Sequence, residues 1–166
     1  MDVVLDTSVL INFLRVGRLD LLRDHPDYTF IVTDHVRAEI GEHFKEQIEA
    51  INGAVTDGTL VEITVTDTAE LEIFGKLSSA RSLGSGECSA VAVAINRALP
   101  VALDDVRAQK KAKAFHADID LLDTAKLMIS LIQHNVLDLE AADAIKVEWE
   151  TRFRFKLKIS SFGELL

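Results

Sequence analysis

The chain has 166 residues, of which 48% are hydrophobic and 27% charged, and its formal net charge is −9 at pH 7. This length and mixture are those of one globular domain with its own core, and the negative charge argues against sequence-blind attraction to nucleic acid. The single cysteine, Cys88, excludes an intramolecular disulfide, and no segment approaches the roughly 20 apolar residues that a membrane span needs.

The first half of the chain alternates short apolar segments with amphipathic ones. In chain order the expected elements are a strand at 2–6, helices at 7–17 and 18–24, a strand at 28–33, a helix from 34 to about 51 and a strand at 60–65. Gly17 closes the first helix. The longest helix carries an apolar stripe at helical spacing, formed by Val36, Ile40, Phe44, Ile48 and Ile51.

The second half continues the alternation after a glycine-rich break. In chain order the expected elements are a helix at 68–83, a break at 84–86, a helix at 87–99, a strand at 101–104, a helix at 106–116, a strand at 118–122 and helices at 124–135 and 139–150. The helix at 87–99 is apolar on nearly every side, which indicates burial, so Cys88 is expected to be an inert core thiol.

Short strands that alternate with helices predict a mostly parallel sheet with helices on both faces, which is a three-layer α/β/α sandwich. We expect a single domain over 1–166, in which 136–166 is a C-terminal extension of helix and strand packed on the rest. Within this extension, basic and apolar residues alternate in the sequence "RFRFKLKI" at 152–159. This period of two favours a charged, protected edge strand over a grip for RNA or a docking site for a partner.

Acidic residues occur where the predicted strands end, and ligands bind at this edge of parallel sheets. Asp6 follows the apolar residues "VVL", and the pair Asp104 and Asp105 follows "VAL". Glu87 shares the buried face of its helix, whereas Glu39 lies about 60° from the apolar stripe of its own helix. Buried carboxylates without partners are costly, and a shared Mg²⁺ or Mn²⁺ with oxygen ligands removes that cost.

Each acid also has a simpler interpretation. Asp6 is suited to cap the first helix, and one of Asp104 and Asp105 is suited to cap the next. Glu39 is also consistent with a solvated helix residue, and Glu87 with a residue that complements the helix dipole. What favours a metal site is that four unrelated segments place an acid at the same end of the sheet.

Four segments resemble PIN-domain nucleases in their order and approximate spacing, and the resemblance covers about 1–135. The segments read "VVLDTSVLINFL", "VRAEI", "LGSGECSAVAVAI" and "VALDDVRAQKKA". The last two, with "DIDLLDTAKLMISLIQHNVLD" further on, resemble the subgroup related to the toxins of VapBC-type toxin–antitoxin pairs.

The resemblance implies a Mg²⁺- or Mn²⁺-dependent endoribonuclease that leaves a 3′-hydroxyl by in-line attack of a metal-activated water. It assigns the metal ligands to Asp6, Glu39, Glu87 and one member of the pair Asp104 and Asp105. Where many PIN proteins have Asp, this chain has Glu87. Alignment by eye favours Asp105 as the last ligand, and the position of the strand end favours Asp104. An antitoxin that covers the site and a homodimer are also expected from the resemblance.

Hydroxyl and basic side chains lie close to these acids in the sequence. Thr7 and Ser8 are candidates to orient Asp6 or a water, or else to cap the first helix. Candidates to hold RNA phosphates are Arg107, Lys110 and Lys111 on one side of a helix, with Arg15 and Arg18 as a second edge, although a solvated helix face explains them equally well.

Three functions remain open from the sequence. The preferred one is a metal-dependent endoribonuclease, and the N-terminal residues lack the basic start of a signal peptide, so its expected setting is the cytoplasm with no membrane contact. The alternatives are a nuclease for DNA or for a particular nucleic-acid structure, and a catalytically inactive PIN-like binding or regulatory module. A nucleotide-binding protein is disfavoured because the chain has no GxGxxG or P-loop pattern.

Overall fold

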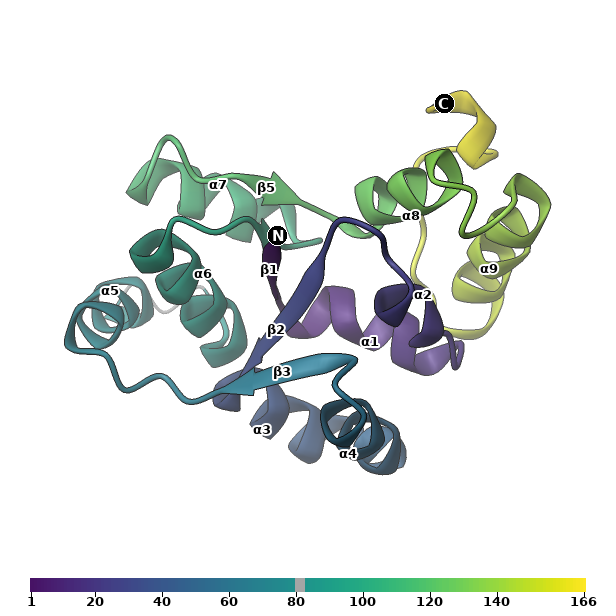
Figure 1. Ribbon diagram of the computed structural model, residues 1–166. Helices are drawn as coiled ribbons and strands as arrows, with labels where there is room; N and C mark the ends of the chain where they lie inside the picture. Colours follow the sequence, from purple (N-terminus) through teal and green to yellow (C-terminus); the bar gives the residue numbers. More distant parts are fainter. Residues whose placement is uncertain (80–82) are drawn as a thin grey trace.

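A parallel sheet forms the centre of the computed structural model, which describes residues 1–79 and 83–166 (Figure 1). Its strands lie in the order β3-β2-β1-β4-β5, and every neighbouring pair is parallel. They are β1 (Asp2–Leu5), β2 (Thr29–Thr33), β3 (Leu60–Ile63), β4 (Val101–Ala102) and β5 (Leu121–Leu122). Crossovers of this kind require helices between successive strands, as the sequence predicts.

Helices cover both faces of the sheet, which confirms the predicted three-layer α/β/α sandwich. They are α1 (Thr7–Arg15), α2 (Asp20–Arg23), α3 (Asp34–His43), α4 (Ile48–Thr56), α5 (Thr68–Ser79), α6 (Ser85–Arg97), α7 (Val106–Phe115), α8 (Thr124–Gln133) and α9 (Leu139–Arg152), with short 3₁₀ turns at Lys45–Gln47 and Phe162–Glu164. None of the helices in the described ranges is long and apolar enough to cross a bilayer.

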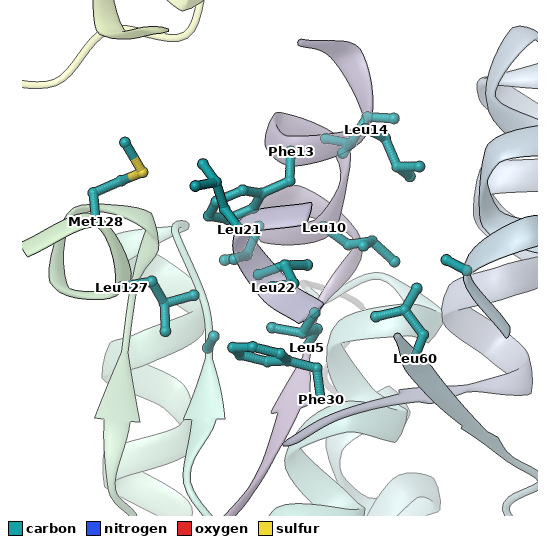
Figure 2. Packing of buried hydrophobic residues seen from close by; sticks show 14 of the residues in the cluster. Leu5, Leu10, Phe13, Leu14, Leu21, Leu22, Phe30, Leu60, Leu127 and Met128 are labelled. Carbon is teal, nitrogen blue, oxygen red and sulfur yellow. The ribbon is translucent and has the colours of Figure 1, made fainter. Parts of the chain in front are cut away.

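The two faces of the sheet belong to separate hydrophobic clusters. In β1, Val3 and Leu5 point to the cluster that includes α1, α2, α8 and α9, whereas Val4 points to the cluster of α5, α6 and α7. Figure 2 shows Leu5, Phe13 and Phe30 among the side chains of the first of these clusters. The alternation follows from the period of two along a strand, and it fixes which face each helix covers.

The C-terminal helix α9 belongs to the first cluster. Trp149 is fully buried, and its indole Nε1 donates a hydrogen bond of 2.8 Å to the backbone oxygen of Asn12 in α1. Phe162 of the last 3₁₀ turn is also fully buried in this cluster. The C-terminal residues therefore share their core with the helix that follows Asp6.

The predicted continuous helix from 34 to about 51 is wrong. The chain leaves the helical conformation at Phe44, where φ is −134° and ψ is 55°, and resumes it only in the 3₁₀ turn before α4. Ile40 and Ile51 are buried as predicted, but Ile48 is 37% exposed. The apolar spacing is preserved across the break, so periodicity alone does not reveal it.

Two further predictions need correction. The segment 152–159 forms no edge strand: α9 extends to Arg152, and an irregular extended tail follows. The alternation itself is confirmed, because the apolar side chains of the tail pack on the core and the basic ones are exposed. The glycine-rich residues 84–86 begin α6 rather than interrupt the chain, and the end of the helix predicted at 68–83 falls at 80–82, outside the described residues.

Candidate metal site and nucleic-acid cleft

Asp6 ends β1 and begins α1 at the carboxyl edge of the sheet. Its Oδ2 accepts hydrogen bonds from the Ser8 backbone N–H at 3.2 Å and from the Ser8 hydroxyl at 2.6 Å. Its Oδ1 is buried and has no hydrogen-bond partner in the described part of the chain. Burial raises the pKa of Asp6, and the Glu39 carboxylate adds to the rise. Asp6 is thus the N-cap of α1 and also presents one oxygen that no protein donor uses.

Glu39 is fixed in place by the start of α6 and by α1. Its Oε1 accepts hydrogen bonds from the Gly86 N–H at 2.8 Å and from the Ser85 hydroxyl at 3.0 Å, and its Oε2 accepts one of 2.7 Å from Thr7. A Cβ at Gly86 would lie 2.6 Å from Glu39 Oε2 and 2.7 Å from Thr7 Oγ1, so this approach requires glycine. The Thr7 hydroxyl therefore orients Glu39 rather than Asp6.

Glu87 lies at the start of α6 and close to the other acids. Its Oε2 accepts a hydrogen bond of 2.8 Å from the Gly84 N–H, which satisfies an unpaired donor at the start of α6. Partial burial raises the pKa of Glu87, and the charges of Asp6, Asp105 and Glu39 contribute to the rise. The side chain thus closes the helix start and at the same time faces the other acids.

The adjacent aspartates have different roles. Asp105 is the N-cap of α7, and its Oδ1 accepts hydrogen bonds from the backbone N–H groups of Arg107 at 2.7 Å and Ala108 at 3.0 Å. Asp104 points the other way: it accepts from Asn12 Nδ2 at 2.9 Å and from the backbone N–H and hydroxyl of Thr124 at 2.9 and 2.6 Å. Burial raises the pKa of Asp104 to about 6, and the charges of Asp123 and Asp6 add to the rise.

The structure brings all five acids to two adjoining clefts, which share Ser8, Ile11 and Phe44. The first cleft has a volume of about 350 Å³ and is lined by Asp6, Thr7, Ser8, Ile11, Glu39, Phe44, Gly84 and Glu87. The second has a volume of about 440 Å³ and is lined by Ser8, Ile11, Asn12, Arg15, Phe44, Asp104, Asp105, Phe153, Arg154 and Phe155. The parallel pairing of β1 with β4 places Asp6 and Asp104 at the same edge.

The carboxylates suit a hard divalent cation in their chemistry but do not form a closed cage. Within residues 1–79 and 83–166, no three His, Cys, Asp or Glu side chains are grouped as ligands of one ion. The carboxylates of Glu39 and Asp104 instead accept hydrogen bonds from protein donors. The donor set consists of oxygen atoms, as Mg²⁺ and Mn²⁺ prefer, and the buried Oδ1 of Asp6 accepts no hydrogen bond from the described residues.

The predicted basic residues are distributed unevenly around the clefts. The guanidinium of Arg15 lies 4.9 Å from the Phe44 ring centroid and lines the second cleft. Arg18 does not form a second edge, because it is bonded to Asp20 by two N–H groups. Arg107 is exposed beside Asp105, with 3.9 Å between Nη2 and Oδ2.

The other two predicted lysines are further along α7. Lys110 is exposed, and Lys111 lines a separate, mostly apolar cleft with Lys76, Leu77, Ala114 and Phe115. Of the candidates on α7, the structure therefore places Arg107 beside an acid of the site and Lys111 away from both clefts.

Several residues that shape the site were not identified from the sequence. Asn12 and Thr124 hold Asp104, and Ser85 and Gly86 hold Glu39. Asn12 did carry a signal, because it is a polar residue within the otherwise apolar helix α1 and buried polar groups need partners. The glycine-rich pattern around Gly86 instead predicts a chain break.

A protein-family model described as PIN domain matches residues 2–160, so the chain belongs to the PIN-domain family. The resemblance inferred from the sequence motifs is thereby confirmed. A search of curated proteins gives no match.

The fold is also similar to that of solved structures. A PilT N-terminus domain protein, SSO1118, from the hyperthermophilic archaeon Sulfolobus solfataricus P2 has a TM-score of 0.56 and 18% identity, over 81% of this chain and 96% of that chain. VapBC-1 from nontypeable Haemophilus influenzae has a TM-score of 0.54 and 15% identity, over 76% of this chain and 100% of that chain. VapBC2 from Rickettsia felis, bound to a DNA fragment from its promoter, has a TM-score of 0.54 and 14% identity, over 74% of this chain and 98% of that chain.

Proposed function

We propose that this PIN domain is a Mg²⁺- or Mn²⁺-dependent endoribonuclease. The observation that carries the proposal is the meeting of Asp6, Glu39, Glu87 and Asp104 at one edge of the sheet, where Asp6 keeps a buried oxygen without a partner. Family membership supports a nuclease, and the oxygen donors support a hard cation. The ligands that we assign are these four carboxylates, with water completing the coordination.

We assign Asp104 rather than Asp105, because burial and the charge of Asp6 raise the pKa of Asp104, whereas the side chain of Asp105 is 40% exposed and its Oδ1 caps α7. The bound ion would activate a water and offset the charge that develops on the phosphate. Ser8 and Thr7 orient the carboxylates of Asp6 and Glu39, and Asn12 and Thr124 orient Asp104. This positioning limits the rearrangement that is needed when the ion binds.

The test is cleavage of an unstructured RNA by the purified chain with Mn²⁺ and with a chelator. We expect cleavage only with Mn²⁺, products that end in a 3′-hydroxyl, and loss of at least about a hundredfold in rate for Asp6→Asn, as for other groups that stabilise transition-state charge. Asp105→Asn is the matched control and should retain activity, since Asn caps a helix as well as Asp does. If a DNA strand of the same sequence is cleaved in preference to the RNA, the activity is that of a deoxyribonuclease and the ribonuclease proposal is wrong.

An inactive PIN-like binding module is the competing function. It is favoured by the hydrogen bonds that hold Glu39 and Asp104 on protein donors rather than in a cage. Absence of cleavage with Mn²⁺, together with unchanged RNA binding in Asp6→Asn, would favour this function over the nuclease.

We also infer a protein partner of the antitoxin kind, because two of the similar folds belong to VapBC complexes. Such a partner would cover the acidic clefts and inhibit cleavage. Co-purification with the product of a small neighbouring reading frame, followed by the cleavage assay, tests this inference. Sedimentation of the chain alone tests the expected homodimer.

A further inference from the structure

The C-terminal tail, which the sequence motifs of the nuclease site do not include, contributes one wall of the second cleft. Phe153, Arg154 and Phe155 line one wall, and Asp104 and Asp105 lie within the same cleft. Its volume of about 440 Å³ falls in the range of roughly 300–1,000 Å³ that is typical of small-molecule sites. The tail therefore meets the candidate metal site directly.

The tail is held rigidly where it lines the cleft. The backbone N–H groups of Phe153 and Phe155 both donate to the Trp149 oxygen at 3.1 Å, and the Phe155 ring lies edge-on to Trp149 at 5.5 Å. Between them, Arg154 has a φ of +58°, which a non-glycine residue adopts only under a local constraint. Trp149 is in turn bonded to Asn12, the residue that holds Asp104.

Arg15 is fixed between two aromatic rings at the cleft wall. Its guanidinium carbon lies 4.9 Å from the centroid of Phe44 and 5.5 Å from that of Phe153. Although two aspartates line the same cleft, neither Arg15 nor Arg154 forms an ion pair within 4.0 Å in the described part of the chain. Two guanidinium groups and three aromatic rings thus face a cleft beside the acids.

We propose that this cleft binds one unpaired nucleotide of the RNA strand next to the phosphate that is cut. The base stacks on the wall of Phe44, Arg15 and Phe153, and Arg15 and Arg154 hold a flanking phosphate. Aromatic and guanidinium planes accept every base, because each base has a π-face. The proposal rests on the proposed function for the identity of the strand, and it adds a subsite for one unpaired base that is formed by α1, Phe44 and the C-terminal tail.

An acidic protein segment is an alternative ligand for this cleft, because its negative charge would complement Arg15 and Arg154. A base is favoured because the Arg15 guanidinium and the Phe44 and Phe153 rings form a wall of planar groups on which a base can stack, and because Phe44 belongs to both clefts and joins this wall to Asp6. A carboxylate in the cleft would in addition lie beside Asp104 and Asp105.

The test measures binding in the absence of divalent ions, so that it does not depend on cleavage. A dye-labelled, unstructured RNA of ten nucleotides and an abasic ribose-phosphate strand of the same length are titrated at low salt with a chelator. Phe153→Leu should weaken binding of the intact RNA about tenfold, as removal of one stacking contact does, and leave binding of the abasic strand unchanged. Phe115→Leu, which alters a 41% exposed ring in the separate cleft on α7, is the matched control and should change neither.

A second variant guards against a folding defect in the tail. Arg15→Lys keeps the charge but removes the plane that stacks, and it should weaken binding of the intact RNA several-fold, with unchanged emission of Trp149, the chain's single tryptophan. Equal losses for the intact and abasic strands, or no loss in either variant, would overturn the proposal. An acidic peptide that competes as well as RNA would assign the cleft to a protein partner and overturn it too.

Failure of this proposal is distinguishable from failure of the nuclease proposal. If RNA binds in a base-dependent way but is not cut with Mn²⁺, the nuclease fails and the nucleotide cleft stands. If RNA is cut but Phe153→Leu and Arg15→Lys bind it normally, the cleft proposal alone fails.

Discussion

Replacing Asp104 by Asn should stabilise the folded chain at neutral pH. Burial raises the pKa of Asp104 from 3.8 to about 6 in the folded state. A rise of about 2 pKa units, at about 1.4 kcal/mol each, corresponds to about 3 kcal/mol. The shift disfavours the carboxylate form in the folded state. The free energy of unfolding therefore falls by this amount as the pH rises from about 3.8 to above about 6. Below pH 3.8 the group is protonated in both states and the effect disappears.

The hydrogen bonds of Asp104 reduce the expected gain. Asn can still accept from the Thr124 N–H, which lies 2.9 Å from Oδ1, but its amide nitrogen would face Asn12 Nδ2, which now donates to Oδ2. Losing that hydrogen bond costs about 1 kcal/mol or more. The net gain at pH 7.5 should therefore be about 1–2 kcal/mol, which raises the melting temperature by about 2–8 °C for a chain of this size.

The assay is thermal unfolding followed by circular dichroism, with a chelator present, at pH 7.5 and at pH 4. Asp104→Asn should melt above the wild type at pH 7.5 and show little or no gain at pH 4. Asp105→Asn serves as the control and should melt with the wild type at both pH values, because the helix cap is kept. A gain of equal size at the two pH values, or a loss at pH 7.5, would refute the reasoning.

Two further predictions concern the support of the site and the core. Gly86→Ala should displace the Glu39 carboxylate and reduce RNA cleavage at least about tenfold, whereas Gly75→Ala, which meets no atom within 4 Å, should leave cleavage unchanged and stabilise its exposed helix by about 0.5–1 kcal/mol. Burial lowers the pKa of His25 from 6.5 to about 4, so stability should fall by up to about 3 kcal/mol as the pH drops from 6.5 to 4, since only the unfolded chain takes up that proton. In urea unfolding, the free energy of unfolding of His25→Phe should depend less on pH between 6.5 and 4 than that of the wild type. Identical pH profiles of the two proteins would contradict the attribution of this dependence to His25.

The sheet and the convergence of the acids were predictable because both follow from local patterns. Short apolar runs with helices between them specify parallel strands, and residues after parallel strands meet at one edge. Asp6 and Asp104 lie at that edge through the pairing of Leu5 with Ala102. Which member of the aspartate pair caps α7 was not predictable, since it depends on β4 ending at Ala102 and α7 beginning at Val106.

The errors occurred where tertiary contacts override a periodic pattern. Phe44 continues an apolar stripe in the sequence, yet the backbone leaves the helical conformation at this residue and its ring packs beside Arg15. The period of two at 152–159 predicts a strand, but an extended tail anchored to Trp149 produces the same alternation of exposure. The glycine-rich pattern at 84–86 predicts a break, whereas Gly86 lies within α6 and permits the close approach of Glu39.

Calorimetric titration with Mn²⁺ at pH 7.5 tests most directly whether carboxylates from distant segments share one ion. The wild type should bind Mn²⁺, and Asp6→Asn, Glu39→Gln, Glu87→Gln and Asp104→Asn should each weaken binding at least about tenfold, as the loss of a ligand does, while Asp105→Asn binds like the wild type. Binding that survives all four substitutions unchanged, or that is lost in Asp105→Asn alone, would contradict the metal site.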